Sequence, residues 1–218
     1  MALAPAYTDP KPRLRGWLHL AAFPIALLAG LTLIATAPTL PGRLTTAVYV
    51  AASAALFGIS ALYHRTDLSQ RATAVLKRLD HANIYLIIAG TYTPIAVLAL
   101  HGTPRTALLT VIWTGAALGV AFRILWHGAP RWLYTVLYIV LGWSAAFVIP
   151  QLATGAGTTA TTLIFTGGIL YTIGGIVYAA KRPNPSTRWF GFHEVFHALT
   201  IAAYTAQFTA VALIVQAA

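Results

Sequence analysis

Three histidines occur at spacings that could hold a metal ion. His193 and His197 are four residues apart, and His64 follows Ser60 at the same spacing. On a helix, a separation of four residues is a rotation of about 40°, so the members of each pair share one face and lie about 6 Å apart along the axis. Three imidazoles on rigid helices suit Zn²⁺, which in catalytic sites takes three protein ligands and leaves one position for water. The candidate metal ligands are therefore His64, His193 and His197.

Asp80 and Ser60 are the candidate catalytic groups beside those histidines. Both residues occur close to the ends of apolar runs, where polar side chains are scarce. A carboxylate can accept a proton from zinc-bound water, and a hydroxyl can orient that water or a substrate carbonyl. The alternative is that the three histidines, Asp80 and Ser60 form hydrogen bonds between helices without a metal.

A second zinc interpretation comes from the segment His193-Glu-Val-Phe-His197, which matches the HExxH pattern of zinc metalloproteases. The two interpretations share both histidines and differ over the general base, which is Asp80 in the first and Glu194 in the second. Adjacent helical residues point about 100° apart, so Glu194 need not face the metal, although the geometry does not exclude it. The third-ligand motif of intramembrane zinc proteases, an aspartate in an Asn-Pro-x-Asp-Gly context, is absent from the sequence.

The composition indicates what kind of protein must position these residues. Of the 218 residues, 58% are hydrophobic and 8% are charged, whereas about 25% of a typical soluble domain is charged. So few charges cannot cover the surface of a soluble fold, and soluble enzymes and disordered chains fit poorly. The chain has no cysteine, which excludes disulfides, thiolate metal sites and cysteine nucleophiles. An integral membrane protein remains.

Seven apolar runs are long enough to cross a bilayer, whose hydrocarbon core of about 30 Å needs roughly 20 residues of helix. They lack the alternation of β-strands, and the short connections rich in Pro and Gly make consecutive helices antiparallel neighbours. We predict an all-α seven-transmembrane helix bundle. Residues 1–16 form a short basic cytoplasmic segment, and residues 17–218 form a single transmembrane domain. The runs cover residues 17–36, 45–63, 82–100, 106–126, 132–149, 159–180 and 193–217.

The longest polar connection, residues 64–80, carries apolar residues at helical spacing. This pattern is typical of a short helix lying in the membrane interface, and a solvated loop is the alternative.

The basic residues predict the orientation of the bundle in the membrane. The chain has 14 Lys and Arg and a net charge of +10. With seven crossings, Arg43 and Arg105 fall on one side and the other 12 basic residues fall opposite. Since basic loops stay in the cytoplasm, we expect a cytoplasmic N-terminus and a C-terminus outside. The same topology brings Ser60, Asp80 and the three histidines to the cytoplasmic ends of their helices.

Three motifs in this order resemble those of bacterial hemolysin III proteins. The family belongs to the progestin and adipoQ receptor (PAQR) group, within a membrane-hydrolase superfamily that includes alkaline ceramidases. The resemblance spans all seven runs. The motifs are Ser60-Ala-Leu-Tyr-His64; Arg78-Leu-Asp-His-Ala-Asn-Ile-Tyr85 with Ala89-Gly-Thr-Tyr-Thr-Pro94; and Phe190-Gly-Phe-His-Glu-Val-Phe-His197.

This resemblance implies a zinc ion bound near the cytoplasmic surface by the three histidines, with Asp80 holding the zinc-bound water and Ser60 beside it. In the superfamily, such a site is linked to hydrolysis of lipid amides such as ceramide. Glu194 is not shared by the eukaryotic receptors, which argues against its being an obligatory base. The implied partners are membrane lipids and a lipid-like substrate or ligand, and not nucleic acid. The implied location is the bacterial cell membrane.

Three functional hypotheses follow. The first is a zinc-dependent hydrolase of a lipid-like amide or ester, with Asp80 as the base. The second is a zinc-stabilised membrane regulator or receptor-like protein without catalysis. The third is an intramembrane protease that uses Glu194. A transporter is disfavoured, because its polar groups would lie near the membrane midplane rather than at one face.

The remaining residues of note receive structural explanations. His19, His101 and His127 lie near the ends of apolar runs, and we expect them to face water. Gly115 and Gly119 have the GxxxG spacing that lets two membrane helices approach closely, so we expect them to serve packing.

Overall fold

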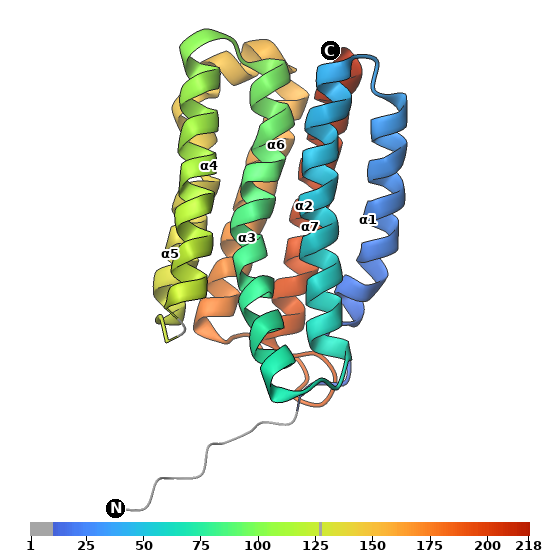
Figure 1. Ribbon diagram of the computed structural model, residues 1–218, viewed down its shortest axis with the longest axis vertical. Coiled ribbons are helices and arrows are strands. Elements are labelled where there is room, and N and C mark those ends of the chain that lie inside the picture. The colour runs from blue at the N-terminus through green and yellow to red at the C-terminus, as the bar shows by residue number, and fades with distance from the viewer. Residues whose placement is uncertain (1–10, 127) are drawn as a thin grey trace, which may run out of the picture.

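The computed structural model describes residues 11–126 and 128–218, as a bundle of long helices (Figure 1). The expectations for residues 1–10 and for His127 lie outside the described residues. The elements are α1 (Trp17–Thr36), α2 (Leu40–Arg65), α3 (Gln70–Ala99), α4 (Gly102–Leu125), α5 (Arg131–Gly142), the short 3-10 helix η1 (Ser144–Val148), α6 (Ile149–Ala180) and α7 (Phe192–Ala217).

Capping side chains explain where two of the site-bearing helices begin. The Thr39 hydroxyl accepts a hydrogen bond from the Gly42 backbone N–H at 3.2 Å, at the start of α2. The Ser69 hydroxyl does the same for the Ala72 N–H at 3.3 Å, at the start of α3. These bonds satisfy backbone donors that have no partner within the first turn of a helix.

The segment before Asp80 differs from the expectation of a separate interfacial helix. It is helical, but residues 70–80 form the first turns of α3, which continues to Ala99. The physical reason is that no glycine or proline interrupts residues 70–89, so nothing ends the helix once Ser69 has capped it.

Among residues 11–126 and 128–218, six helical segments are long and apolar enough to cross a membrane. Five are α1 to α4 and α7, and the sixth is a single stretch of 50 residues, Arg131–Ala180, that contains α5, η1 and α6. Within it, Gly157 has φ 78° and ψ 160°, which breaks the helical course of α6. The all-α membrane class is therefore confirmed, with six candidate segments in place of the seven expected.

The long stretch Arg131–Ala180 folds back on itself. The Trp143 indole N–H donates to the Thr172 hydroxyl at 2.9 Å, and Gly175 packs against Thr135 and Ile139. Since lower numbers on α5 meet higher numbers on α6, the two helices run antiparallel. In Figure 1 the chain reverses at the upper end, between these two helices.

Helix α3 lies at the centre of the bundle and contacts α2, α4, α5, α6 and α7. The most hydrophobic part of α3 is 72% buried, compared with 22% for α1 at the edge. Any site between α3 and its neighbours is therefore enclosed by protein.

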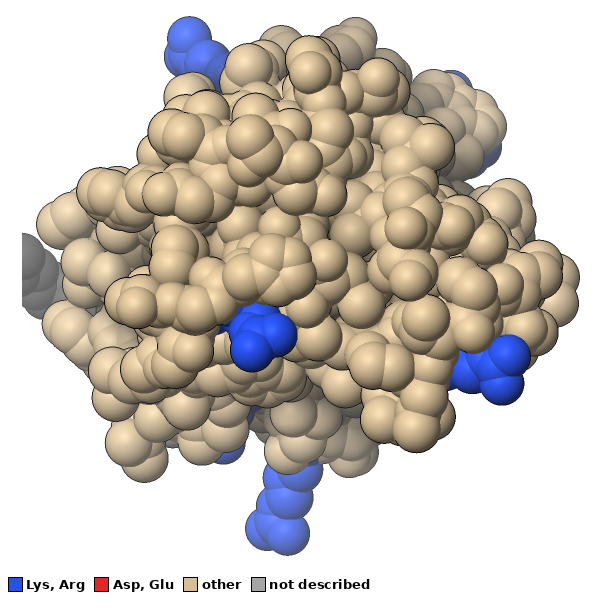
Figure 2. Space-filling view, turned by 90° about the horizontal axis from the view of Figure 1, so that it is seen from above, with Lys and Arg blue, Asp and Glu red and all other residues tan. Residues whose placement is uncertain are grey.

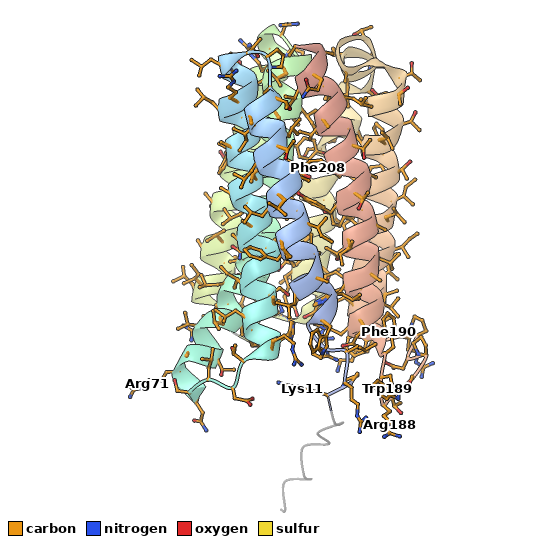
Figure 3. The ribbon with its side chains drawn as sticks, turned by 90° about the vertical axis from the view of Figure 1, so that its right-hand side faces the viewer. Lys11, Arg71, Arg188, Trp189, Phe190 and Phe208 are labelled. Atoms are coloured by element: carbon orange, nitrogen blue, oxygen red, sulfur yellow. The ribbon has the colours of Figure 1, made fainter. Side chains whose placement is uncertain are left out.

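The two ends of the bundle differ in charge. The end at which α2 ends and α7 begins, here called the histidine end, also carries Lys11, Arg71 and Arg188 (Figure 3). The opposite face, seen from above in Figure 2, has few basic side chains and no visible acidic ones. The C-terminus lies at this opposite end (Figure 1).

Small residues set the spacing of α4 against its neighbours, as the GxxxG pattern predicts. A Cβ atom added at Gly115 would lie 2.5 Å from Leu141, and one added at Gly119 would lie 2.3 Å from the ring of Tyr85. Real Cβ atoms do not approach so closely, so both positions require glycine for the observed packing.

We expect Gly119→Ala to lower the melting temperature of the detergent-solubilised protein. The added methyl group would displace the buried ring of Tyr85, and overpacking of this kind costs about 1–3 kcal/mol. Gly142→Ala is the matched control, because nothing lies within 4 Å of a Cβ atom at that position. Equal melting temperatures for the two variants would contradict the packing role of Gly119.

Candidate metal centre and active site

The three candidate metal ligands come together at the histidine end. His64 lies in the last turn of α2, and His193 and His197 lie in the first turns of α7. One ring nitrogen from each lies within 4.8 Å of the other two, and the Nε2 atoms of His64 and His193 are 3.1 Å apart. Two imidazole nitrogens on one tetrahedral zinc ion, each about 2.0–2.1 Å from it, would be about 3.3 Å apart. The trio could therefore bind a metal ion.

Asp80 and Ser60 lie beside this trio, on α3 and α2. Ser60 is buried, and its side chain is close enough to the Asp80 carboxylate to interact with it. Both side chains line the same cavity as His193 and His197. Asp80 is only half-buried because part of its surface faces this cavity. The fold thus brings all five residues singled out from the sequence to one place.

The cavity extends from the histidines into the bundle between α3, α5, α6 and α7. Its wall is mostly apolar, with Ile87 and Phe196 among the lining residues, and its deep end includes Thr91 and Gln207. Asp80 and Thr91 are eleven residues apart on α3, which is about 16 Å along a helix. A long and mostly apolar cavity with Asp80 and the histidines at one end suits an apolar chain that carries a polar head.

Glu194, the alternative base, is occupied by two other interactions. It is 1% exposed, and its Oε1 atom forms an ion pair with Arg15. Its Oε2 atom accepts a hydrogen bond from the Gly191 backbone N–H at 2.8 Å, which closes the first turn of α7. One carboxylate oxygen therefore caps α7, and the other holds Arg15 in the segment before α1. Glu194 is not among the residues that line the cavity.

The expectation that His19 faces water is wrong. His19 is only 3% exposed, and its ring stacks on that of His197 with centroids 3.7 Å apart and planes 3° from parallel. The His19 ring also packs nearly perpendicular to that of Phe57, with centroids 5.1 Å apart and planes at 83°. Both ring nitrogens are buried without a hydrogen-bond partner among the described residues. A fourth imidazole therefore belongs to the cluster.

The burial of His19 follows from the packing of α1 against Phe57 on α2 and His197 on α7, and the segment before α1 also bonds to this end of the bundle. The Arg13 backbone N–H donates to the Arg188 carbonyl at 3.0 Å, and that of Leu14 donates to the Trp189 carbonyl at 3.3 Å. These bonds fold the segment under the histidine end and cover the first turn of α1. The sequence could have predicted that His19 joins the cluster, because its position in the first run puts it at the same membrane depth as the other three histidines. His101, at the opposite end, is exposed as expected.

His81 is a second residue that the sequence left without a role of its own. It lines the cavity beside Asp80. Its Nδ1 atom lies 2.7 Å from the Lys77 carbonyl, and its Nε2 atom lies 3.0 Å from the Tyr178 hydroxyl. The imidazole thus links α3 to α6 at the mouth of the cavity.

Comparisons with known proteins agree with this architecture. Residues 7–208 match the family model described as haemolysin-III related. The chain belongs to the haemolysin III family. It is 34% identical over 145 residues to the hemolysin-3 homolog of Bacillus subtilis (strain 168), which covers 63% of this chain and 68% of that protein. This haemolysin III chain is a multi-pass integral membrane protein of the bacterial membrane.

Two further relatives extend the comparison. The chain is 37% identical over 115 residues to hemolysin-3 of Bacillus cereus, a match that covers 52% of each protein. It is 22% identical over 173 residues to the human monocyte to macrophage differentiation factor, covering 78% of this chain and 69% of that protein. The sequence similarity to this eukaryotic protein thus extends over most of the chain.

We expect Glu194→Gln to destabilise the protein. The substitution leaves Arg15 without its partner, and removing one member of a buried ion pair costs about 3 kcal/mol or more. The measurement is the melting temperature in detergent, with Asp67→Asn, an exposed residue in the turn before α3, as the control. The double variant Arg15→Gln with Glu194→Gln should lose less than the sum of the two single losses. A melting temperature for Glu194→Gln equal to that of Asp67→Asn would refute the structural role of the ion pair.

Proposed function

We propose that this protein is a zinc-dependent membrane hydrolase that acts on a lipid-like amide or ester at the cytoplasmic face of the membrane. The observation that carries the proposal is the position of Asp80 and Ser60. Both lie beside the histidine trio, at one end of a long and mostly apolar cavity. The apolar part suits an acyl chain, and the polar end suits the bond to be cleaved.

The proposal includes seven membrane crossings with a cytoplasmic N-terminus. The stretch Arg131–Ala180 contributes two of them, which is supported by the antiparallel packing of α5 against α6 and by the break at Gly157. The orientation is supported by the basic residues gathered at the histidine end, since basic loops remain in the cytoplasm.

In the proposed reaction, His64, His193 and His197 hold the metal. When bound, Zn²⁺ lowers the pKa of a coordinated water toward 7 and polarises a carbonyl. Asp80 accepts the proton from the attacking water and later delivers it to the leaving group. Ser60, which lines the cavity beside Asp80, would orient that carboxylate. The apolar cavity wall positions the acyl chain and excludes bulk water.

The competing hypotheses make different demands on Glu194 and Asp80. Both oxygens of Glu194 are engaged, which disfavours a protease that needs this residue as its base. A zinc-stabilised regulator without catalysis would need the histidines but not Asp80. The hydrolase therefore requires Asp80, whereas the zinc-stabilised regulator does not.

Metal analysis of the purified protein tests the first part of the proposal. We expect about one zinc ion per chain, and we expect His64→Ala to lose most of it, because two ligands remain where zinc requires three or four. His101→Ala is the control, since this exposed histidine lies at the opposite end. If the wild-type protein contains no zinc after purification without chelators, the hydrolase and the zinc-stabilised regulator both fail.

Asp80→Asn separates the hydrolase from the regulator. We expect hydrolysis of a fluorescent long-chain amide or ester to fall by about 10²-fold or more, the usual contribution of a general base. The zinc content should be unchanged, because the histidines are intact. Asp67→Asn supplies the control for loss of a carboxylate elsewhere. Full activity of Asp80→Asn would rule out the proposed base, and a lack of hydrolysis by the zinc-loaded wild type across the substrate panel would favour the regulator.

A further inference from the structure

Arg123 is a buried cation that no carboxylate of the described residues pairs with. It lies in the last turn of α4, which ends at the histidine end (Figure 1), and it is 5% exposed. Its Nε and Nη1 atoms are both buried and have no hydrogen-bond partner among the described residues. A guanidinium is always charged and carries five N–H donors, so burying it without acceptors is costly. An ionisable side chain in such a position is expected to face a ligand or a partner.

Aromatic rings hold the guanidinium in place. Its central carbon lies 4.3 Å from the ring centroid of Tyr134. Tyr134 packs against Tyr138 at 5.9 Å, and Tyr138 packs against Tyr85 at 4.6 Å. The rings come from α5 and α3, so Arg123 is enclosed by the three helices α3, α4 and α5. A cation held over an aromatic face is oriented but not neutralised.

A second unpartnered donor lies in the same place. The Tyr85 hydroxyl is buried without a hydrogen-bond partner among the described residues, and Tyr85 is close enough to Arg123 to interact with its charge. Gly119, one turn before Arg123 on the same face of α4, gives the Tyr85 ring room to lie against that helix. By contrast, the Tyr138 hydroxyl is already used, because it donates to the His81 carbonyl at 3.0 Å. Among the described residues, the site therefore offers two kinds of unpartnered donor, the guanidinium N–H groups of Arg123 and the hydroxyl of Tyr85.

The acidic residues of the described part of the chain are committed elsewhere. Asp67 is exposed in the turn before α3, and Asp80 faces the cavity beside Ser60. Glu194 pairs with Arg15. No carboxylate of residues 11–126 and 128–218 thus pairs with Arg123, so within the described residues its guanidinium lacks an anionic acceptor.

We propose that Arg123 and Tyr85 form a binding site for a phosphate oxyanion. The planar fork of an arginine matches two phosphate oxygens, and the Tyr85 hydroxyl supplies a further donor. Phosphates are abundant at this level of the bundle, because lipid headgroups surround the ends of membrane helices. The site is separate from the proposed active site, since neither Arg123 nor Tyr85 is among the residues that line that cavity. It therefore does not depend on the hydrolase proposal.

The site is tested by ligand binding to the full-length protein in detergent, measured from the shift in melting temperature over a concentration series. The three probes are dioctanoyl phosphatidylglycerol, dioctanoylglycerol without a phosphate, and inorganic phosphate. We expect phosphatidylglycerol to stabilise the protein and dioctanoylglycerol to leave it unchanged. Stabilisation by inorganic phosphate as well would identify a site that is open to the free anion, and its absence would identify a lipid-bound phosphate as the ligand.

Variants decide whether Arg123 carries the binding. Arg123→Gln should weaken the binding of phosphatidylglycerol about tenfold or more, since bonds from a charged donor are lost. Tyr85→Phe, which keeps the ring and the packing, should weaken it about fivefold. Arg71→Gln is the matched control, because it removes the same charge from an exposed position at the same end (Figure 3).

The proposal is overturned if Arg123→Gln and Arg71→Gln bind phosphatidylglycerol equally well, or if dioctanoylglycerol stabilises the wild type as strongly as phosphatidylglycerol. Should Arg123→Gln fail to fold, Tyr85→Phe alone decides the question, and binding equal to wild type would then count against the site. Zinc content should be the same in all these variants, so the outcome is independent of the metal centre.

Discussion

A polar group at membrane depth is costly unless a partner satisfies it, because the bilayer core offers no water. This constraint shapes the histidine end of the bundle. Arg15 pairs with Glu194, which in turn caps α7, and the imidazoles of His19 and His197 stack on each other. The apolar composition that makes the chain a membrane protein thus forces its few polar residues into close contact. The cluster of histidines at this end is a result of that close contact.

The constraint also separates the roles of two acidic residues that look equivalent in the sequence. Glu194 lies within an HExxH pattern, and Asp80 lies in a different helix. Glu194 has both oxygens satisfied by protein, whereas Asp80 keeps part of its surface toward the cavity. A carboxylate that already holds a cation and a helix terminus cannot readily act as a base. The environment of each carboxylate, and not the motif around it, therefore favours Asp80.

Helical periodicity and the distribution of charge were sufficient to predict the helical bundle and the meeting of His64, His193 and His197. Each prediction needed only the spacing of residues along a helix and the fact that consecutive membrane helices run in opposite directions. His19 was misjudged because its burial depends on the packing of α1 against α2 and α7, which no local pattern reveals. The partner of Glu194 was missed for the same reason, since Arg15 lies 179 residues away. The unpaired state of Arg123 could not be predicted either, because it depends on where every acidic residue lies in space.

The bonds between the segment before α1 and the start of α7 have a consequence for biosynthesis. The histidine trio draws one member from α2 and two from α7, and the Arg15–Glu194 pair joins the two extremes of the chain. During synthesis, the first five-sixths of the protein would leave the ribosome with His64 and Arg15 still waiting for their partners. The site can be completed only when the last helix enters the bundle. A prematurely terminated chain would therefore lack the complete trio.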